Sequence, residues 1–341
     1  MRNRIVKTTA LASAVFGVLL SVALLNADAS SPWGRDYFPN TKLITQDGKS
    51  VNFYDDLIKG KIVAIDLIYT QCKDACPLET ARLRQVQRIL GDRVGKDIFF
   101  YSISIDPEHD TPEVLHDYAE MYNAGPGWLF LTGKKDEIIS LSKKLGLYWD
   151  PNPRNRDGHA AALLIGNEKT GQWTKISATD NPRFLAIMIS QFMDSYRNQQ
   201  VAQHSERTDY SKASPLQLND PGQYVFATHC AACHSIGQGD RIGPDLAGVT
   251  TRRDRGWLSR FIADPDKLLD EKDPITVDLF NRYKHVRMPN LRLADADVDA
   301  VIAFLQKQST AQSRTATQEN KGSTAANELA ADSDSAHEIK R

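Results

Sequence analysis

The chain has 341 residues, of which 41% are hydrophobic, so it is long enough to form two or three globular domains with their own cores. Its 42 lysines and arginines balance 43 acidic residues, which leaves a formal net charge of -1. This balance excludes the basic surface expected of a nucleic-acid-binding protein. We therefore expect protein and cofactor partners.

The N-terminal segment predicts export. Basic residues precede an apolar run from Thr9 to Leu25, and a small-residue pattern typical of a signal-peptidase site ends at Ala29. The run lies at the short end of the roughly 17 to 25 residues that span a bilayer, so residues 1–29 are either a cleaved signal peptide or a retained membrane anchor. Both outcomes place the rest of the chain on the periplasmic side of a bacterial inner membrane.

Residues 31–198 alternate predicted strands with predicted helices, which is typical of an α/β domain with helices packed on a sheet. Strands are expected where apolar residues run together, and helices where they recur at a period of 3.6. The predicted strands cover 61–70, 97–106 and 128–133, with a hairpin over 161–177, and the predicted helices begin after Pro77, at Pro112, and over 134–146 and 181–198.

The C-terminal part predicts a second, smaller domain. Residues 199–216 are polar and have no apolar period, which indicates a linker. A small all-α domain is expected over 217–308, ending in a helix with Val298 and Ile302 on its apolar face. Residues 309–341 have almost nothing to bury and are expected to be disordered.

The four cysteines form two close pairs, Cys72 with Cys76 and Cys230 with Cys233. An exported chain of this size does not need a disulfide framework, so each pair is expected to carry chemistry.

The second pair lies in the sequence CAACH, residues 230–234, which is the attachment pattern of a covalent c-type haem. Its thiols stand one turn apart, so both can bond the vinyl groups of one haem while His234 binds the iron. The alternative is a chance pentapeptide in a redox or zinc loop.

The flanks of this motif resemble those of a class I cytochrome c. The resemblance is carried by the Gly-Pro-x-Leu segment that begins at Gly243 and by Met288-Pro289. It implies that the Pro244 carbonyl orients the His234 ring and that Met288 is the distal iron ligand. His285 is a rival ligand, and Met288 is alternatively a core thioether beside a five-coordinate iron. Ligation by His and Met leaves no open position on the iron, which favours electron transfer.

The first pair, in YTQCKDACP, belongs to a set of motifs that resembles the Sco/SenC family. The others are FPN (38–40), TQDGK (45–49), SIDPEHDTPE (104–113) and RDGHAA around His159. The resemblance implies a thioredoxin-like fold with a central mixed sheet and one copper ion held by Cys72, Cys76 and His159. It also implies that the chain helps to assemble the copper centre of cytochrome c oxidase, with the copper-site subunit or its apo form as partner.

Residue chemistry agrees with this implication. Soft thiolates favour Cu(I) and an imidazole also suits Cu(II), so Cys72, Cys76 and His159 could hold either state. The first turn of the helix after Cys72 is expected to lower the pKa of both thiols, which favours copper binding and thiol exchange alike. A purely structural disulfide would close a very small loop and stabilise the chain little.

Asp66 stands inside an apolar predicted strand, where a carboxylate is costly unless it is paired or protonated. Thioredoxins resemble this chain in carrying a buried acid six positions before the first cysteine, where the acid moves protons during dithiol exchange. The other interpretation is that Asp66 only faces a polar neighbour or water.

These patterns predict a copper-binding Sco-type assembly factor with a tethered haem c for electron transfer. It would deliver copper to the oxidase copper centre or reduce the thiols of that centre, and redox cytochromes are further expected partners. The alternatives are a thiol-disulfide oxidoreductase with no obligatory metal and a plain periplasmic electron carrier. Whether the chain is an enzyme stays open at this point.

Overall fold

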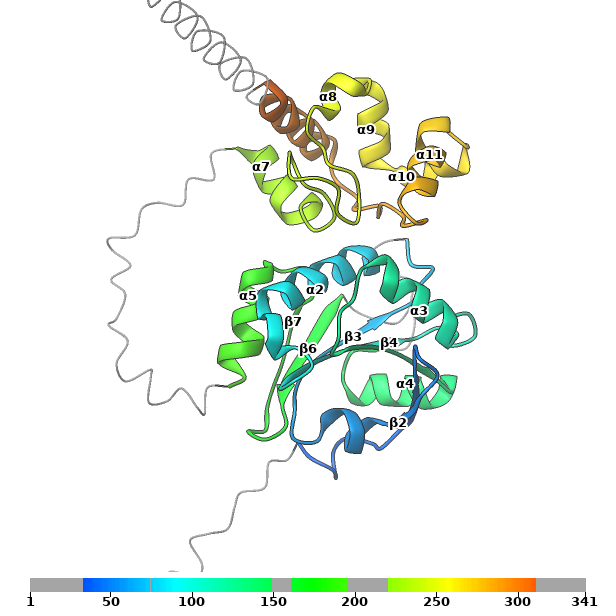
Figure 1. Ribbon diagram of the computed structural model, residues 1–341, viewed down its shortest axis with the longest axis vertical. Helices are drawn as coiled ribbons and strands as arrows, with labels where there is room; N and C mark the ends of the chain where they lie inside the picture. The colour runs from blue at the N-terminus through cyan, green and yellow to red at the C-terminus, as the bar shows by residue number, and fades with distance from the viewer. Residues whose placement is uncertain (1–32, 74, 149–160, 195–219, 311–341) are drawn as a thin grey trace, which may run out of the picture.

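A computed structural model of the protein describes residues 33–73, 75–148, 161–194 and 220–310 (Figure 1). The predicted N-terminal segment 1–29, the linker 199–216, His159 and residues 311–341 of the predicted tail lie outside these ranges. Within the described ranges, no helix is long and apolar enough to cross a membrane.

The first domain is built on a seven-stranded sheet with the strand order β2-β1-β5-β4-β3-β6-β7. Strands β3, β4 and β5 pair in parallel, and the outer pairs are antiparallel. The strands are β1 (Lys42–Thr45), β2 (Ser50–Asn52), β3 (Ile62–Ile68), β4 (Ile98–Ser104), β5 (Trp128–Gly133), β6 (Ala162–Asn167) and β7 (Gln172–Ser177).

Helices cover both faces of this sheet. One core packs α2, α3 and α5 against the sheet, and a second core lies on the opposite face under α4 and the π-helical turn η1. The predicted α/β class is therefore confirmed. The helices are η1 (Phe53–Ile58), α2 (Cys76–Leu90), η2 (Gly91–Arg93), α3 (Pro112–Met121), α4 (Lys135–Lys144) and α5 (Pro182–Ile187), which continues as η3 (Met188–Phe192).

Alternation along β3 decides which side chains face α2. Ile62, Ala64 and Ile68 belong to the core under α2, whereas Val63 and its alternate neighbours belong to the opposite core. Asp66 has the same parity as the first set, and side chains two positions apart in a strand share a face. The strand therefore directs the Asp66 carboxylate toward α2.

The second domain is all-α, as predicted. Its apolar centre packs Trp257, Leu258 and Leu268 against Val298 and Ile302 of the last helix, which covers 295–310 in the described part of the chain. The other helices are α7 (Pro221–Val225), η5 (Phe226–Cys230), α8 (Val249–Arg252), α9 (Arg255–Ala263), α10 (Pro265–Asp270) and α11 (Pro274–Arg282).

The two domains touch along α2. Ala232 of the helical domain is buried in the same apolar core as α2, and Figure 1 shows the helical domain lying over the side of the α/β domain that carries α2. The CAACH turn is thus brought beside the helix that begins at Cys76.

A close helix crossing in the second domain gives the first testable prediction. A Cβ atom at Gly222 of α7 would lie 2.0 Å from the Ala300 carbonyl oxygen of the last helix, so Gly222→Ala forces the two helices apart. We expect the free energy of unfolding of this domain to fall by about 1–3 kcal/mol. Urea denaturation followed by circular dichroism, with the two domain transitions fitted separately, measures this loss. The helical Gly256→Ala is the control, because a Cβ there meets only a flexible carboxylate oxygen 3.1 Å away; an equal loss in both variants would contradict the crossing.

Candidate functional site

The thiols of Cys72 and Cys76 lie together where β3 leads into α2. Cys72 follows the strand in a turn closed by its N–H, which donates to the Tyr69 carbonyl at 3.1 Å, and Cys76 is the first residue of α2. Neither forms a disulfide, their side chains are 5% and 0% exposed, and they are hydrogen-bonded to each other. The structure thus brings together the two cysteines that the sequence pattern singled out.

The expected lowering of the thiol pKa values is wrong for Cys76. The hydrogen bond with Cys72, burial, and the negative charges of Cys72 and Glu79 all raise the pKa of Cys76 well above its usual value. The helix N-terminus does favour a thiolate, but desolvation of a fully buried sulfur opposes it. In the metal-free protein, Cys76 is therefore held as a thiol.

Asp66 is 1% exposed and points at the same site. Its Oδ1 accepts a hydrogen bond from Ser102 Oγ at 2.7 Å, and Ser102 Oγ in turn accepts one from Trp128 Nε1 at 2.9 Å. Its Oδ2 is buried without a hydrogen-bond partner among the described residues. Burial raises the pKa of Asp66 to about 7, against an opposing contribution from Ser102. The sequence allowed two interpretations of Asp66, a carboxylate beside a polar neighbour and an acid that moves protons. The structure shows Ser102 as the polar neighbour, and the pKa of Asp66 is also raised.

Glu79 is a site residue that sequence reasoning missed. It is 1% exposed, and its Oε1 is buried with no hydrogen-bond partner in the described part of the chain. Burial, followed by the charges of Asp66 and Cys72, raises the pKa of Glu79 well above its usual value. The sequence did carry a signal of this burial. Glu79 stands three positions after Cys76 and four before Leu83, so helical spacing places it on the same face of the helix as these two residues. A glutamate in the first turn of a helix is ordinarily exposed, where it stabilises the helix dipole.

A buried aspartate anchors the loop that carries Cys72. Asp110 is fully buried, and it accepts hydrogen bonds from the Thr70 N–H at 3.2 Å and from the Thr70 and Ser104 hydroxyl groups. The residue two positions before Cys72 is therefore tied to the end of β4. This contact fixes where the first thiol lies.

The donor set suits copper as far as it is described. Once deprotonated, the thiols of Cys72, in the turn after β3, and Cys76, at the start of α2, can hold a single soft ion such as Cu(I). No group of three or more His, Cys, Asp or Glu side chains in the described ranges is arranged to hold a metal. The predicted third ligand, His159, lies outside those ranges, so its role stays a prediction.

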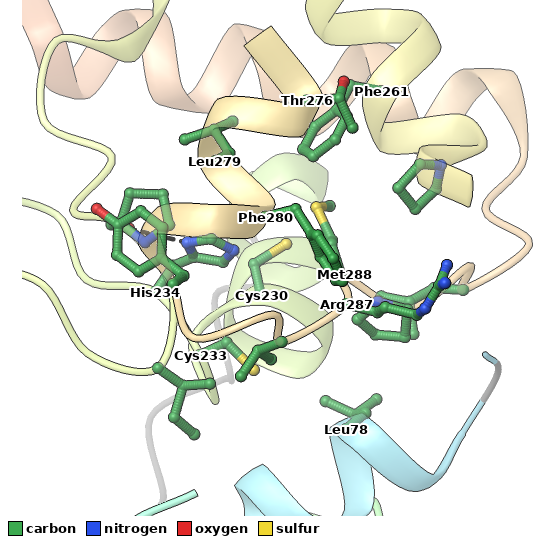
Figure 2. Close-up of a pocket in the computed structure, with 18 of the residues that line it drawn as sticks. Leu78, Cys230, Cys233, His234, Phe261, Thr276, Leu279, Phe280, Arg287 and Met288 are labelled. Carbon is green, nitrogen blue, oxygen red and sulfur yellow. Dashed lines mark hydrogen bonds between the residues drawn. The ribbon is translucent and has the colours of Figure 1, made fainter. Parts of the chain in front are cut away.

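The second pair of cysteines lines a pocket of about 900 Å³, counted out to its open mouth. Figure 2 shows His234 and Met288 on either side of Cys230, and Leu78 pointing toward the pocket from α2. The wall is mostly apolar, as a haem requires. Its residues include His229, Cys230, Cys233, His234, Phe261, Leu279, Phe280, Val286 and Met288.

His234 is held for ligation by its neighbours. Its Nδ1 lies 2.8 Å from the Pro244 carbonyl oxygen, which leaves Nε2 for an iron. A Cβ at Gly243 would lie 2.6 Å from Cε1 of the ring, so only glycine lets the imidazole occupy this place. The pocket therefore fits a haem on geometric grounds, while the assignment of each ligand stays a prediction.

The two rival distal ligands lie in different places. Met288 lines the pocket, whereas His285 is exposed and its ring packs edge-on against Phe280 at 5.0 Å. This arrangement favours Met288. His229, which sequence reasoning did not single out, also lines the pocket, and its Nδ1 is buried with no hydrogen-bond partner within the described ranges.

The raised pKa of Asp66 gives a second testable prediction. Because the pKa is about 7 in the folded chain and 3.8 without the fold, the folded state holds the extra proton between these values. The stability that the protonated side chain contributes is complete below pH 3.8 and is lost as the pH rises to about 7. Relative to Asp66→Asn, the free energy of unfolding of the wild type should fall by about 1.4 kcal/mol per pH unit in this interval and level off above it.

Chemical denaturation at a series of fixed pH values measures this difference. The difference between wild type and Asp66→Asn measured below pH 3.8 serves as the control, because the protonated aspartate and the asparagine are both neutral there. Parallel curves for wild type and variant through neutral pH would contradict the assignment.

Comparison with known proteins divides the chain into the same two domains as the fold. The SCO1/SenC family model matches residues 34–194, and the cytochrome c family model matches residues 220–309. The chain is similar to a SCO2-like protein of Rickettsia prowazekii, with 27% identity over 165 residues that cover 46% of this chain and 74% of that protein.

The chain is also similar to a SCO1 homologue of Bacillus subtilis, with 37% identity over 101 residues that cover 29% of this chain and about half, 51%, of the relative. Among solved structures, the copper-bound ScoI of Bradyrhizobium japonicum is 26% identical, with a TM-score of 0.38, and the match covers 45% of this chain and 96% of that one.

The cytochrome c match implies covalent haem c at the CAACH pocket. The predicted family resemblances are confirmed, together with the thioredoxin-like and all-α fold classes that they implied. Residues 34–194 thus match the SCO1/SenC family and residues 220–309 match the cytochrome c family.

Proposed function

We propose that the chain is a copper-binding assembly factor that serves the copper centre of cytochrome c oxidase. The observation that carries this proposal is the buried, hydrogen-bonded thiol pair at the start of α2, in a domain of the SCO1/SenC family. Neither of these two cysteines forms a disulfide in the structure. They are available to a metal or to a partner's cysteines.

Copper is the cargo in this proposal. Cys72 and Cys76 bind it as thiolates, and His159 supplies a nitrogen that suits Cu(II) as well as Cu(I). Binding releases the proton of Cys76, since the raised pKa of this residue keeps it protonated without metal. Asp66, on the α2 side of the sheet, has a pKa of about 7, so its ionised fraction near neutral pH can accept this proton as copper enters.

The cytochrome domain serves the same site. Cys230 and Cys233 would hold the haem covalently, and His234 and Met288 would bind its iron. Bound haem c supplies or accepts one electron at a time, which matches the single-electron step between Cu(II) and Cu(I). The Leu78 side chain lines the haem pocket only two residues beyond Cys76, so the two centres are neighbours.

The oxidase copper-site subunit, or its apo form, is the proposed recipient, and redox cytochromes are the proposed electron partners. We place this exchange on the periplasmic side of a bacterial inner membrane. The basic and apolar N-terminal sequence supports this location, as does the c-type haem motif.

A second candidate function is thiol-disulfide exchange without metal. The observation that favours it is the raised pKa of Asp66, about 7, on the α2 side of the sheet. An acid with this pKa can give and take a proton near neutral pH, as dithiol chemistry requires. The thiol pair would then reduce the cysteines of the oxidase subunit before copper arrives, and it would do so in metal-free buffer.

Copper titration of the full chain tests the first proposal and is the third testable prediction. Wild type should bind a single copper ion, and Cys72→Ser or Cys76→Ser should abolish stoichiometric binding because one thiolate remains. His159→Ala should keep Cu(I) but weaken Cu(II) at least tenfold. Metal analysis after gel filtration and the thiolate-to-Cu(II) charge-transfer band measure these outcomes. His116→Ala, an exposed histidine on α3, is the matched control and should behave as wild type; unchanged stoichiometry in the cysteine variants would remove the assignment.

Electron transfer between the domains is the fourth testable prediction. Protein reduced at the haem and then loaded with Cu(II) should lose its ferrous absorbance in a first-order phase. Because donor and acceptor share one chain, the rate constant should not change on dilution. Stopped-flow absorbance measures it, with Cys72→Ser as the variant that removes the acceptor. A rate proportional to protein concentration would show that the electron passes between molecules instead.

A further inference from the structure

One face of α2 contacts the haem-attachment turn directly. This face, which we call the docking face, consists of Leu78, Arg82 and Gln85, spaced so that they share one side of the helix. Arg82 Nη2 donates to the Thr228 carbonyl oxygen at 2.7 Å, and Gln85 Nε2 donates to the Ala231 carbonyl oxygen at 2.9 Å. Both acceptors lie within three residues of the first haem cysteine, so the docking face is hydrogen-bonded to the backbone of the haem-attachment turn.

Apolar packing reinforces these hydrogen bonds. Ala232, which stands between the haem cysteines, is 2% exposed and shares the core under α2. Cys233, Ile242, Val286 and Leu291 pack against the same core. The haem-attachment turn therefore faces α2, and Figure 2 shows Leu78 of this helix directed toward the pocket.

The docked domain also covers the thiol loop. The Asn290 N–H donates to the Lys73 carbonyl oxygen at 3.2 Å, and Lys73 lies between the two cysteines of the copper site. A partner that approaches Cys72 and Cys76 from this side meets the cytochrome domain first. Access from that side thus depends on whether the two domains are docked.

Arg82 is an unusual residue for such an interface. It is 2% exposed, yet no carboxylate in the described part of the chain forms an ion pair with it. Its acceptors are the neutral Thr228 carbonyl and Gln85 Oε1, the latter at 2.9 Å, and its Nε has no hydrogen-bond partner within the described ranges. Buried arginines are ordinarily paired with a negative group.

The charge of Arg82 reaches the haem pocket. Burial lowers the pKa of His229, which lines the pocket, and the positive charge of Arg82 adds to this lowering. A fixed positive charge favours the less positive of two states nearby, and in a buried site it is screened weakly. The Fe(III) haem carries one positive charge more than the Fe(II) haem, so Arg82 opposes the oxidised state.

We propose that the docking face of α2 binds the chain's own cytochrome domain more tightly when the haem is ferrous, and that the Arg82 guanidinium is the positioning group responsible. By linkage, docking shifts the Fe(III)/Fe(II) equilibrium toward Fe(II) by the same factor by which reduction tightens docking, and so raises the reduction potential of the haem. Loss of one electron from the iron then loosens the interface and uncovers the loop around Lys73. The inference rests on the haem site proposed above and does not require copper.

Redox titration of the copper-free full-length holoprotein tests this proposal, as the fifth testable prediction. Arg82→Gln should shift the Fe(III)/Fe(II) equilibrium about tenfold toward Fe(III), which lowers the midpoint by about 59 mV for a one-electron couple. Arg82→Lys keeps the positive charge, so its midpoint should lie much closer to that of wild type than the midpoint of Arg82→Gln does. Arg88→Gln, which removes a charge from an exposed position of the same helix, is the control and should leave the midpoint near that of wild type.

A merely structural role for Arg82 would not distinguish lysine from glutamine in this way. Equal midpoints in wild type and Arg82→Gln, or equal shifts in Arg82→Gln and Arg88→Gln, would overturn the proposal. Small-angle scattering on wild type provides a test that needs no variant. The radius of gyration should be larger in the ferric than in the ferrous protein, and equal radii would contradict redox-controlled docking. A purified chain without covalent haem would instead refute the haem site, which is a separate failure.

Discussion

The first turn of α2 is covered from two sides, by the sheet on one and by the haem-attachment turn on the other. This double burial decides the chemistry of every group near the turn. On the sheet side it keeps Cys76 as a thiol and holds protons on Asp66 and Glu79. On the cytochrome side it encloses Arg82, whose guanidinium stays charged because its usual pKa is far above neutrality. Neutral acids and a retained cation thus lie on opposite sides of one helix.

Much of this architecture was predictable, because strong local signals coincide with the final contacts. The continuous apolar run at 61–70 became β3, and α3 begins at the predicted Pro112. Thr111 caps this helix, with its Oγ1 accepting from the Val114 N–H at 3.4 Å. The CAACH pentapeptide and the Gly243-Pro244 segment lie together in one pocket. In these cases the residue types determine the local backbone, and neighbouring residues complete the site.

The features that were not predicted depend on contacts between distant residues. The β1–β2 hairpin was missed because its strands are short and half-exposed, so that pairing with β5 is what stabilises β1. Glu79 and Arg82 have the residue types of a solvated helix surface. Their burial follows from the sheet and from a domain whose contacts lie 146 positions along the chain. No pattern within a single helix carries that information.

Cysteines of both domains act electrostatically on one buried tyrosine. Burial raises the pKa of Tyr122, and Cys233, Cys76 and Cys72 each add to the rise. In an oxidising compartment, neighbouring thiols are liable to mispair by disulfide exchange. Thioether formation withdraws Cys233 and Cys230 from such exchange. Haem attachment before the two domains close would leave Cys72 and Cys76 with only each other as disulfide partners within the chain.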